Sequence, residues 1–300
     1  YRGRFVGLVE TAWVWGVLLG IALSYFIIPV YGWRTAFLLA LTPLAIVPII
    51  AARLPESVRY LLEKGMVDEA VATLKRHGLV MGEVKAEKVN VKHVGFAEAL
   101  REVFSARYAK RTEVLWVLWA ALVYTYHGIF IWLPTIYYER FGYSIVKTLW
   151  WTLVVTSAQV PGYYSAALLL DKAGRKGILV PYLAIAGIAC AMLATAGGVN
   201  EVLALSIVIS FFNLGAWSAL YAYTPELYPT EIRGTASGLA ASIGRLAGIL
   251  APSATGFLMY AAKGELVWAY TVFALVHLAA AVVTAMLGIE TKGKPLETLE

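Results

Sequence analysis

Charged residues and cysteines are both scarce in this sequence. Only 15% of its 300 residues are charged, whereas a soluble domain contains about 25%. The single cysteine, Cys190, lies inside an apolar run, so a disulfide within the chain and a cysteine-based zinc cluster are both excluded. The shortage of charge indicates that much of the chain is surrounded by lipid rather than by water.

The residue patterns that carry enzyme chemistry are missing as well. There is no glycine-rich loop followed by lysine, which would bind the phosphates of a nucleotide. There is also no nucleophile elbow, no pair of acidic residues and no Cys/His metal set. We therefore expect no enzymatic activity, no cofactor, no metal ion and an energy source other than ATP.

Long apolar runs are abundant instead, and 60% of the residues are hydrophobic. About 20 consecutive apolar residues cross a bilayer as a helix, and helices satisfy the backbone polar groups where lipid supplies no water. The sequence predicts an all-α polytopic membrane protein with eight transmembrane helices, at 6–28, 35–54, 114–138, 148–170, 178–197, 202–224, 236–260 and 267–288. The run Gln159–Gly162, which includes Pro161, predicts a kink or hinge inside the fourth span.

The polar segment 55–112 separates the second and third spans. Its apolar residues recur at helical spacing and predict an amphipathic surface helix, followed by a flexible linker at 78–95. These apolar residues are Leu61, Leu62, Val67, Ala70, Val71 and Leu74. We therefore divide the chain into 1–54, 55–112, 113–289 and a tail at 290–300.

The positions of Lys and Arg predict how the chain crosses the membrane. If segment 55–112 is cytoplasmic, Arg245 lies within a span and all other Lys and Arg residues but four fall on the cytoplasmic side. The four in the opposite loops are Arg34, Arg140, Lys147 and Lys263. This asymmetry predicts a multi-pass protein of the cytoplasmic (plasma) membrane with both chain ends in the cytoplasm. It also accounts for the net charge of +6 without a nucleic-acid partner.

The sequence contains an internal repeat, because residues 2–20 align without gaps on residues 233–251. The matched pairs are Arg2 with Arg233, Gly3 with Gly234, Gly7 with Gly238 and Leu8 with Leu239. Parallel repeats are typical of transporters built from two similar halves. The second half has six spans, whereas residues 1–54 correspond to the last two of a first half. We therefore expect four further helices upstream and no transport by these 300 residues alone.

Four short motifs at span boundaries resemble signatures of the major facilitator superfamily. They are Leu54-Pro55-Glu56-Ser57 with Arg59, the run Asp171–Lys176, the run Pro225–Gly234, and Glu290-Thr291-Lys292-Gly293. The resemblance implies the major facilitator fold, with the eight spans equivalent to helices 5–12 of twelve. It also implies a secondary transporter that works by alternating access and is a monomer at full length.

Within the superfamily, the stretch from Asn213 to Pro252 resembles the metabolite:proton symporters, which include niacin and aromatic-acid carriers. Sugar porters are less similar, because their glutamine pair and asparagine on helix 7 are replaced here by Tyr124-Thr125 and Phe130. An aromatic wall suits a flat substrate better than a polyol. The resemblance implies a small organic substrate, an aromatic or other organic anion, moved together with protons. A sugar porter and a non-transporting membrane sensor of the same fold are the alternatives.

Arg245 and Glu10 are the two charged candidates for the substrate and proton sites. Arg245 lies deep in its span, where an arginine is costly, and its guanidinium can bind a carboxylate through two hydrogen bonds. Glu10 aligns with a substrate-binding glutamine of sugar porters, and a carboxylate in a partly dry cavity can take up the coupling proton. The alternatives are an Arg245 neutralised by helix carbonyls and a Glu10 solvated near Arg2 and Arg4.

Uncharged candidates for the substrate site lie on two spans. Asn213, Trp217 and Tyr221 recur at every fourth residue and share one helix face, and Tyr124 and His127 lie on the third span. Aromatic residues in membrane helices also serve as packing or interface anchors. A histidine such as His127 can equally bond to a neighbouring helix.

Four charged residues fall at the cytoplasmic ends of the predicted helices: Asp171, Arg175, Glu226 and Arg233. The inner gate of the major facilitator superfamily resembles such a network, so the resemblance implies a gating role for them. The alternative is that they are ordinary solvated loop charges.

Overall fold

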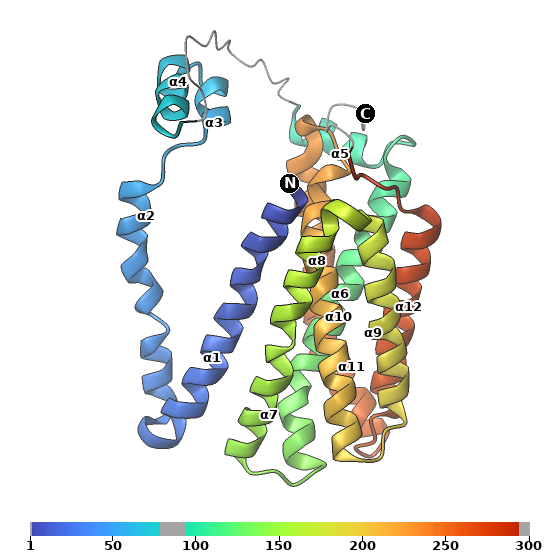
Figure 1. Cartoon of the computed structure of the whole chain (residues 1–300). Helices are drawn as coiled ribbons and strands as arrows, with labels where there is room; N and C mark the ends of the chain where they lie inside the picture. The colour runs from blue at the N-terminus through green and yellow to red at the C-terminus, as the bar shows by residue number, and fades with distance from the viewer. Residues whose placement is uncertain (1, 79–93, 294–300) are drawn as a thin grey trace.

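The computed structural model describes residues 2–78 and 94–293, with the backbone alone at residues 2, 3, 59 and 63. Regular structure in these residues is helical, as the sequence predicts, and no strand occurs among them. In chain order the helices are α1 (Arg2–Leu39), the 3-10 helix η1 (Thr42–Ile46), α2 (Val47–Arg53), α3 (Val58–Glu63), α4 (Val67–Arg76), α5 (Phe96–Val103), α6 (Ala109–Glu139), α7 (Ile145–Ser157), α8 (Gln159–Ala173), α9 (Arg175–Ala194), α10 (Val199–Glu226), α11 (Thr230–Ala261) and α12 (Val267–Leu287) (Figure 1).

The first two predicted spans form a hairpin made of α1, η1 and α2. The turn begins at Gly32, which has a φ of 78°. Glycine adopts this positive φ readily, whereas residues with a Cβ do so only at an energetic cost. Pro43 and Pro48 are the second residues of η1 and α2, where the missing N–H costs no helical hydrogen bond. In Figure 1 α1 leans on the main bundle, whereas α2 stands apart from it.

Helices α6 to α12 form the main bundle. Helix α12 packs on α9 and α6, α11 packs on α6, and α10 packs on α8 and α9. The predicted fourth span is two helices, because α7 ends at Ser157 and α8 begins at Gln159. Gly162, which follows Pro161, lies against the backbone carbonyl of Phe211 on α10, where a Cβ would clash. The predicted interruption is therefore confirmed. The absence of a Cβ at Gly162 allows α8 and α10 to approach closely.

Six helical stretches in the described residues are long and apolar enough to cross a membrane. The first, Arg4–Arg53, contains the first two predicted spans. Helix α11 is not among the six although it has 32 residues, because glycine, serine and Arg245 lower its hydropathy. With α11 and the hairpin counted, the structure agrees with the eight predicted spans.

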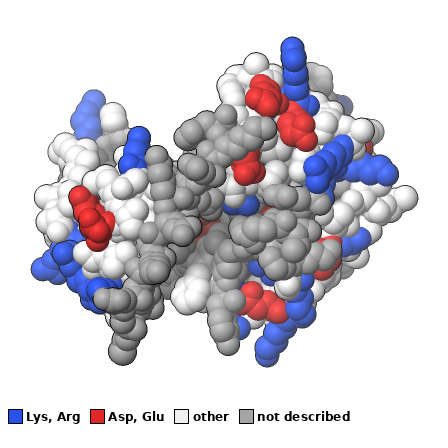
Figure 2. Space-filling view, turned by 90° about the horizontal axis from the view of Figure 1, so that it is seen from above, with Lys and Arg blue, Asp and Glu red and all other residues white. Residues whose placement is uncertain are grey.

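In its described residues, the polar segment 55–112 contains the three short helices α3, α4 and α5 before α6 begins, rather than one amphipathic helix. Helices α3 and α4 pack on each other and bury Leu61 and Ala70. Helix α5 packs on α11 and buries Ala99 and Val103. Most of the predicted linker 78–95, and residues 294–300 of the predicted tail, lie outside the described residues. Seen from above, Lys, Arg, Asp and Glu side chains surround this end of the molecule (Figure 2).

Candidate substrate cavity and cytoplasmic network

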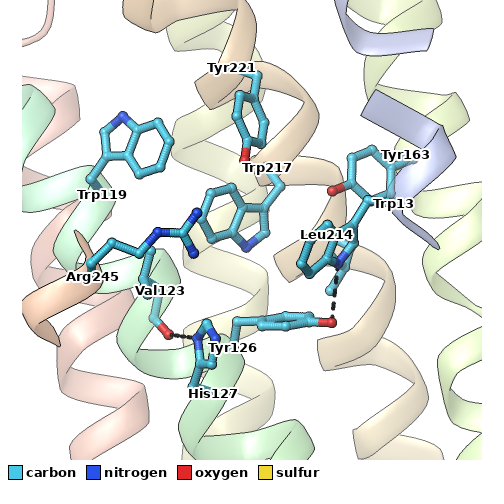
Figure 3. Close-up of a pocket in the computed structure, with 10 residues that line it drawn as sticks. All are labelled: Trp13, Trp119, Val123, Tyr126, His127, Tyr163, Leu214, Trp217, Tyr221 and Arg245. Atoms are coloured by element: carbon cyan, nitrogen blue, oxygen red, sulfur yellow. Dashed lines mark hydrogen bonds between the residues drawn. The ribbon is translucent and has the colours of Figure 1, made fainter. Parts of the chain in front are cut away.

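A cavity lies between α1, α6, α8, α10 and α11. Six of its ten lining residues are aromatic, and Figure 3 shows their side chains facing a common centre. The lining residues are Trp13, Trp119, Val123, Tyr126, His127, Tyr163, Leu214, Trp217, Tyr221 and Arg245.

Three aromatic side chains form one wall of the cavity. The ring of Trp119 on α6 meets Trp217 and Tyr221 on α10 edge to face, with centroids 5.6 and 5.5 Å away. The rings of Trp217 and Tyr221 lie 5.6 Å apart at 33°. The indole N–H of Trp119 donates a hydrogen bond to the Thr224 hydroxyl at 3.0 Å, which fixes the orientation of the ring. The wall is therefore held in place before any ligand arrives.

Arg245 points from α11 toward this wall, with its guanidinium between Trp119 and Trp217 (Figure 3). Two glycines bring it there. A Cβ on Gly244 would lie 2.9 Å from a Val123 methyl, and a Cβ on Gly248 would lie 2.8 Å from the other. The absence of these carbons allows α11 to approach α6. Within the part of the chain that the structure describes, the Arg245 guanidinium has no hydrogen-bond or ion-pair partner.

Of the five uncharged residues predicted for the substrate site, three line the cavity: Trp217, Tyr221 and His127. The Nδ1 of His127 bonds to the backbone carbonyl of Val123, 2.9 Å away. The Nε2 therefore remains for a ligand.

The structure places the other two predicted residues, Asn213 and Tyr124, outside the cavity lining. Asn213 is fully buried, and its Nδ2 bonds to the Thr125 hydroxyl at 3.0 Å and to His277 Nε2 at 2.9 Å. This network joins α6, α10 and α12 behind the cavity. Tyr124 packs edge to face on Phe273, with ring centroids 5.9 Å apart.

Glu10 is half-buried on α1 and lies beside the cavity rather than in its lining. Its carboxylate is near enough to act electrostatically on two lining residues, Tyr163 and Tyr221. A proton gained or lost by Glu10 would therefore change the electrostatic potential at the cavity wall.

Sequence reasoning did not identify four aromatic lining residues, Trp13, Trp119, Tyr126 and Tyr163. Helical spacing on α6 carries a signal for two of them, because Trp119, Val123 and Tyr126 recur at intervals of four and three. The sequence offers no comparable signal for Trp13 or Tyr163, which come from α1 and α8.

Three of the four predicted cytoplasmic residues meet in one network. Nη2 of Arg175 bonds to Glu226 Oε1 at 2.8 Å, and Nη1 lies 3.9 Å from Asp171 Oδ1. Asp171 Oδ2 also lies 3.7 Å from Nε of Arg4, which belongs to α1. The fourth predicted residue, Arg233, donates from Nε to the Tyr228 carbonyl at 3.2 Å. Arg175, Glu226 and Asp171 thus join the ends of α8, α9 and α10, and Arg4 links α1 to them.

The segment after α12 completes this network, although sequence reasoning assigned it no contact there. The Glu290 carboxylate accepts hydrogen bonds from the backbone N–H groups of Arg175 (3.0 Å) and Lys176 (3.1 Å), so it caps the N-terminus of α9. The Thr291 hydroxyl donates to Glu226 Oε2 at 2.6 Å. Gly174, with φ of 84°, lies directly against the Glu290 carboxylate.

The whole chain, residues 1–300, matches the family described as Sugar (and other) transporter. It is 39% identical over 303 residues to the niacin transporter NiaP of Acinetobacter baylyi, covering 99% of this chain and 68% of that protein. It is 35% identical over 296 residues to a putative niacin/nicotinamide transporter of Bacillus subtilis, covering 99% of this chain and 67% of that protein.

Solved structures show the same fold. The proton:xylose symporter XylE bound to 6-bromo-6-deoxy-D-glucose superposes with a TM-score of 0.74 at 22% identity, covering 99% of this chain and 66% of that one. The partially occluded inward-open form of XylE from E. coli superposes with a TM-score of 0.69 at 20% identity, covering 98% of this chain and 65% of that one. The chain thus spans about two thirds of the length of the proteins that it matches. It belongs to the Sugar (and other) transporter family of the major facilitator superfamily, whose members are secondary transporters of small organic molecules and not enzymes.

Proposed function

We propose that this protein transports a small aromatic carboxylate, of the type of nicotinate, together with a proton. Two relatives at 39% and 35% identity carry niacin in their names. The proposal rests on one observation in the cavity: the Arg245 guanidinium faces an aromatic wall and has no hydrogen-bond or ion-pair partner among the described residues.

The chemistry of this arrangement fits a flat anion. A guanidinium offers two parallel N–H donors to the two oxygens of a carboxylate, and charge-assisted hydrogen bonds are roughly twice as strong as neutral ones. Trp119, Trp217 and Tyr221 offer ring faces and edges for an aromatic ring beside it, an interaction worth roughly 0.5–1.5 kcal/mol per ring pair. A carboxylate and a planar ring, joined directly, would engage both features at once.

Glu10 is the proposed proton site. It lies beside the cavity, near Tyr163 and Tyr221, so a bound anion and a proton on Glu10 would stabilise each other. One proton carried with one monocarboxylate makes the transport cycle electrically neutral. This proposal leaves Arg245 to select the substrate and Glu10 to couple it to the proton gradient.

The cytoplasmic network is the proposed inner gate. Its contacts divide into two kinds. Arg175, Glu226 and Asp171 hold together the helix ends of the second half, whereas the Arg4–Asp171 pair at 3.7 Å joins this half to α1. We propose that opening to the cytoplasm breaks the Arg4–Asp171 pair and leaves the contacts among Arg175, Glu226 and Asp171 intact.

A sugar is the weaker candidate substrate. Sugar hydroxyls need several side chains that both donate and accept hydrogen bonds, and amides and carboxylates serve this purpose best. The described lining residues include no Asn, Gln, Asp or Glu. The similarity to XylE, at 22% identity, supports the shared fold and not a shared substrate.

The membrane arrangement follows from the same reasoning and is also a proposal. We propose that the protein lies in the cytoplasmic membrane as a monomer, with the charged end in Figure 2 facing the cytoplasm. The excess of Lys and Arg in the loops on that side supports this orientation. A non-transporting sensor would share all these features, so the decisive assay measures flux as well as binding.

Binding and uptake of three ligands test the substrate. We expect nicotinate to bind, nicotinamide to bind more weakly because it lacks the charge, and xylose not to bind. Arg245→Lys, which removes the bidentate fork, should weaken nicotinate binding about tenfold or more, and Arg245→Ala should abolish it. Arg34→Lys is the matched control, because Arg34 lies over the Trp33 ring, 4.5 Å from its centroid and outside the cavity lining.

Two results would contradict the proposal. Equal nicotinate binding by wild type and Arg245→Ala would remove Arg245 from the site. Binding of nicotinate without saturable uptake by the natural protein expressed from its own gene would favour a sensor over a transporter.

A further inference from the structure

A single hydrogen bond joins α1 to α6 at the cavity. The indole N–H of Trp13 donates to the Tyr126 hydroxyl at 3.3 Å, and the two rings meet edge to face with centroids 6.4 Å apart. Figure 3 shows this pair at the end of the cavity opposite Tyr221. Because Tyr221 lies toward the charged end of α10, the pair lies on the extracellular side in the proposed orientation.

The two partners of this hydrogen bond are held differently. The Tyr126 ring packs against Phe130 and His127, at centroid distances of 5.2 and 5.4 Å, so its position follows that of α6. Trp13 is 53% exposed and is the lining residue contributed by α1. Movement of α1 would therefore carry Trp13 away while Tyr126 stayed with the bundle.

Helix α1 packs closely on the bundle at Gly7, which is buried. A Cβ there would lie 2.6 Å from Ser218 Oγ on α10 and 2.9 Å from Ala167 Cβ on α8. Arg4, with its ion pair to Asp171, lies on one side of this point, and Trp13 lies on the other. At 1.5 Å per residue, Arg4 is about 4.5 Å and Trp13 about 9 Å along the helix from Gly7. A helix that tilts about Gly7 would open one of these contacts while it closed the other.

We propose that Trp13 is a positioning residue whose hydrogen bond to Tyr126 latches the extracellular side of the cavity, with the Gly7 contact as the pivot. The inference rests on the proposed transport function. In the state described here the latch is closed and the Arg4–Asp171 pair is formed, so α1 is joined to the bundle on both sides of Gly7. Opening to the outside requires the latch to break.

The test uses variants that remove the hydrogen bond and keep the rings. Trp13→Phe removes the N–H donor, and Tyr126→Phe removes its acceptor. Val123 lines the cavity and is 2% exposed in the closed state, so a cysteine at this position reports opening. All variants are therefore made together with Val123→Cys. The measurement is the rate at which this cysteine is alkylated by a membrane-impermeant maleimide added outside intact cells. The native Cys190 is buried and should not react. Trp33→Phe is the matched control, because Trp33 lies in α1 and outside the cavity lining and is similarly exposed, at 55%.

Loss of one hydrogen bond should raise the alkylation rate roughly two- to tenfold. Tyr126→Phe should give the same increase, and the double variant should give no further increase because both changes remove one bond. Arg4→Gln should lower the rate, and Arg4→Gln combined with Trp13→Phe should return it toward wild type.

The latch is overturned if neither Trp13→Phe nor Tyr126→Phe changes the alkylation rate, or if Trp33→Phe raises it equally. Each variant must elute as a single species and keep the wild-type melting temperature. If only one of Trp13→Phe and Tyr126→Phe does so, that variant alone tests the latch. Binding of nicotinate is measured separately. A labelling shift in a protein that does not bind nicotinate would therefore contradict the proposed substrate and leave the latch standing.

Discussion

The Arg175–Glu226 ion pair allows a direct test of what burial adds to a charge pair. Its Nη2 to Oε1 distance is 2.8 Å, and the side chains are 6% and 3% exposed. The structure contains a pair with nearly the same distance and little burial. Nη1 of Arg140 lies 2.9 Å from Glu265 Oε2, with side chains 23% and 65% exposed. Any difference between the two pairs therefore reflects their surroundings more than their geometry.

Glu226→Gln removes the charge of the buried pair and keeps the size of the side chain. Arg175 would then keep its more distant contact with Asp171, at 3.9 Å, and its hydrogen bond to the Leu170 carbonyl, at 3.4 Å. Removing one partner of a buried pair costs about 3–5 kcal/mol, and the remaining contact places this case near the lower value, about 3 kcal/mol. Glu265→Gln breaks an exposed pair, which is worth about 0–1 kcal/mol.

The assay is equilibrium unfolding in a detergent mixture in which the protein refolds. We expect Glu226→Gln to lower the free energy of unfolding by about 3 kcal/mol and Glu265→Gln by less than about 1 kcal/mol. The double variant Arg175→Gln, Glu226→Gln should recover part of the loss, because no uncompensated charge stays buried. Equal small losses from Glu226→Gln and Glu265→Gln would refute the reasoning and leave the buried network without a stabilising role.

Two further predictions use matched glycines. Gly244→Ala should weaken nicotinate binding about tenfold, because its Cβ would meet Val123 at 2.9 Å and Trp119 at 3.1 Å and such overpacking costs about 1–3 kcal/mol. Gly238→Ala is the control on the same helix and should leave the Kd unchanged, because nothing lies within 4 Å of its Cβ. Equal Kd values for the two variants would argue against the close approach of α11 and α6. Gly174→Ala and Gly264→Ala both place a Cβ at positive φ, 84° and 86°, at about 1–2 kcal/mol each, but only at Gly174 does it also displace the Glu290 carboxylate. The melting temperature should therefore fall further for Gly174→Ala, and equal falls would mean that the Glu290 cap contributes nothing.

Most of the span pattern and the charged network at the helix ends could be predicted from the sequence, for physical reasons. Lipid forces each long apolar run into a helix, so the spans other than α11 follow from hydropathy. Asp171 and Arg175 are four residues apart across a helix boundary, and Glu226 lies in the motif after the next pair of spans. Charges at helix ends stay near one membrane surface, which restricts their possible partners to a thin layer. Glu290 lies in that layer too, but its contact with the α9 N-terminus depends on the path of the chain after α12.

The lining of the cavity was decided by tertiary structure. Tyr124 and Tyr126 are two residues apart on α6, and their side chains point about 200° apart around the helix. Only Tyr126 lines the cavity. In a soluble protein the polar face of a helix would reveal its rotation, but here lipid and bundle core are both apolar, so the sequence carries almost no signal for it. Arg245 is the exception, because a guanidinium that deep in a span must avoid lipid. The sequence therefore determined which helices form and where one charge must point, whereas close contacts at glycines such as Gly7 and Gly244 set how the helices approach and which aromatic rings line the cavity.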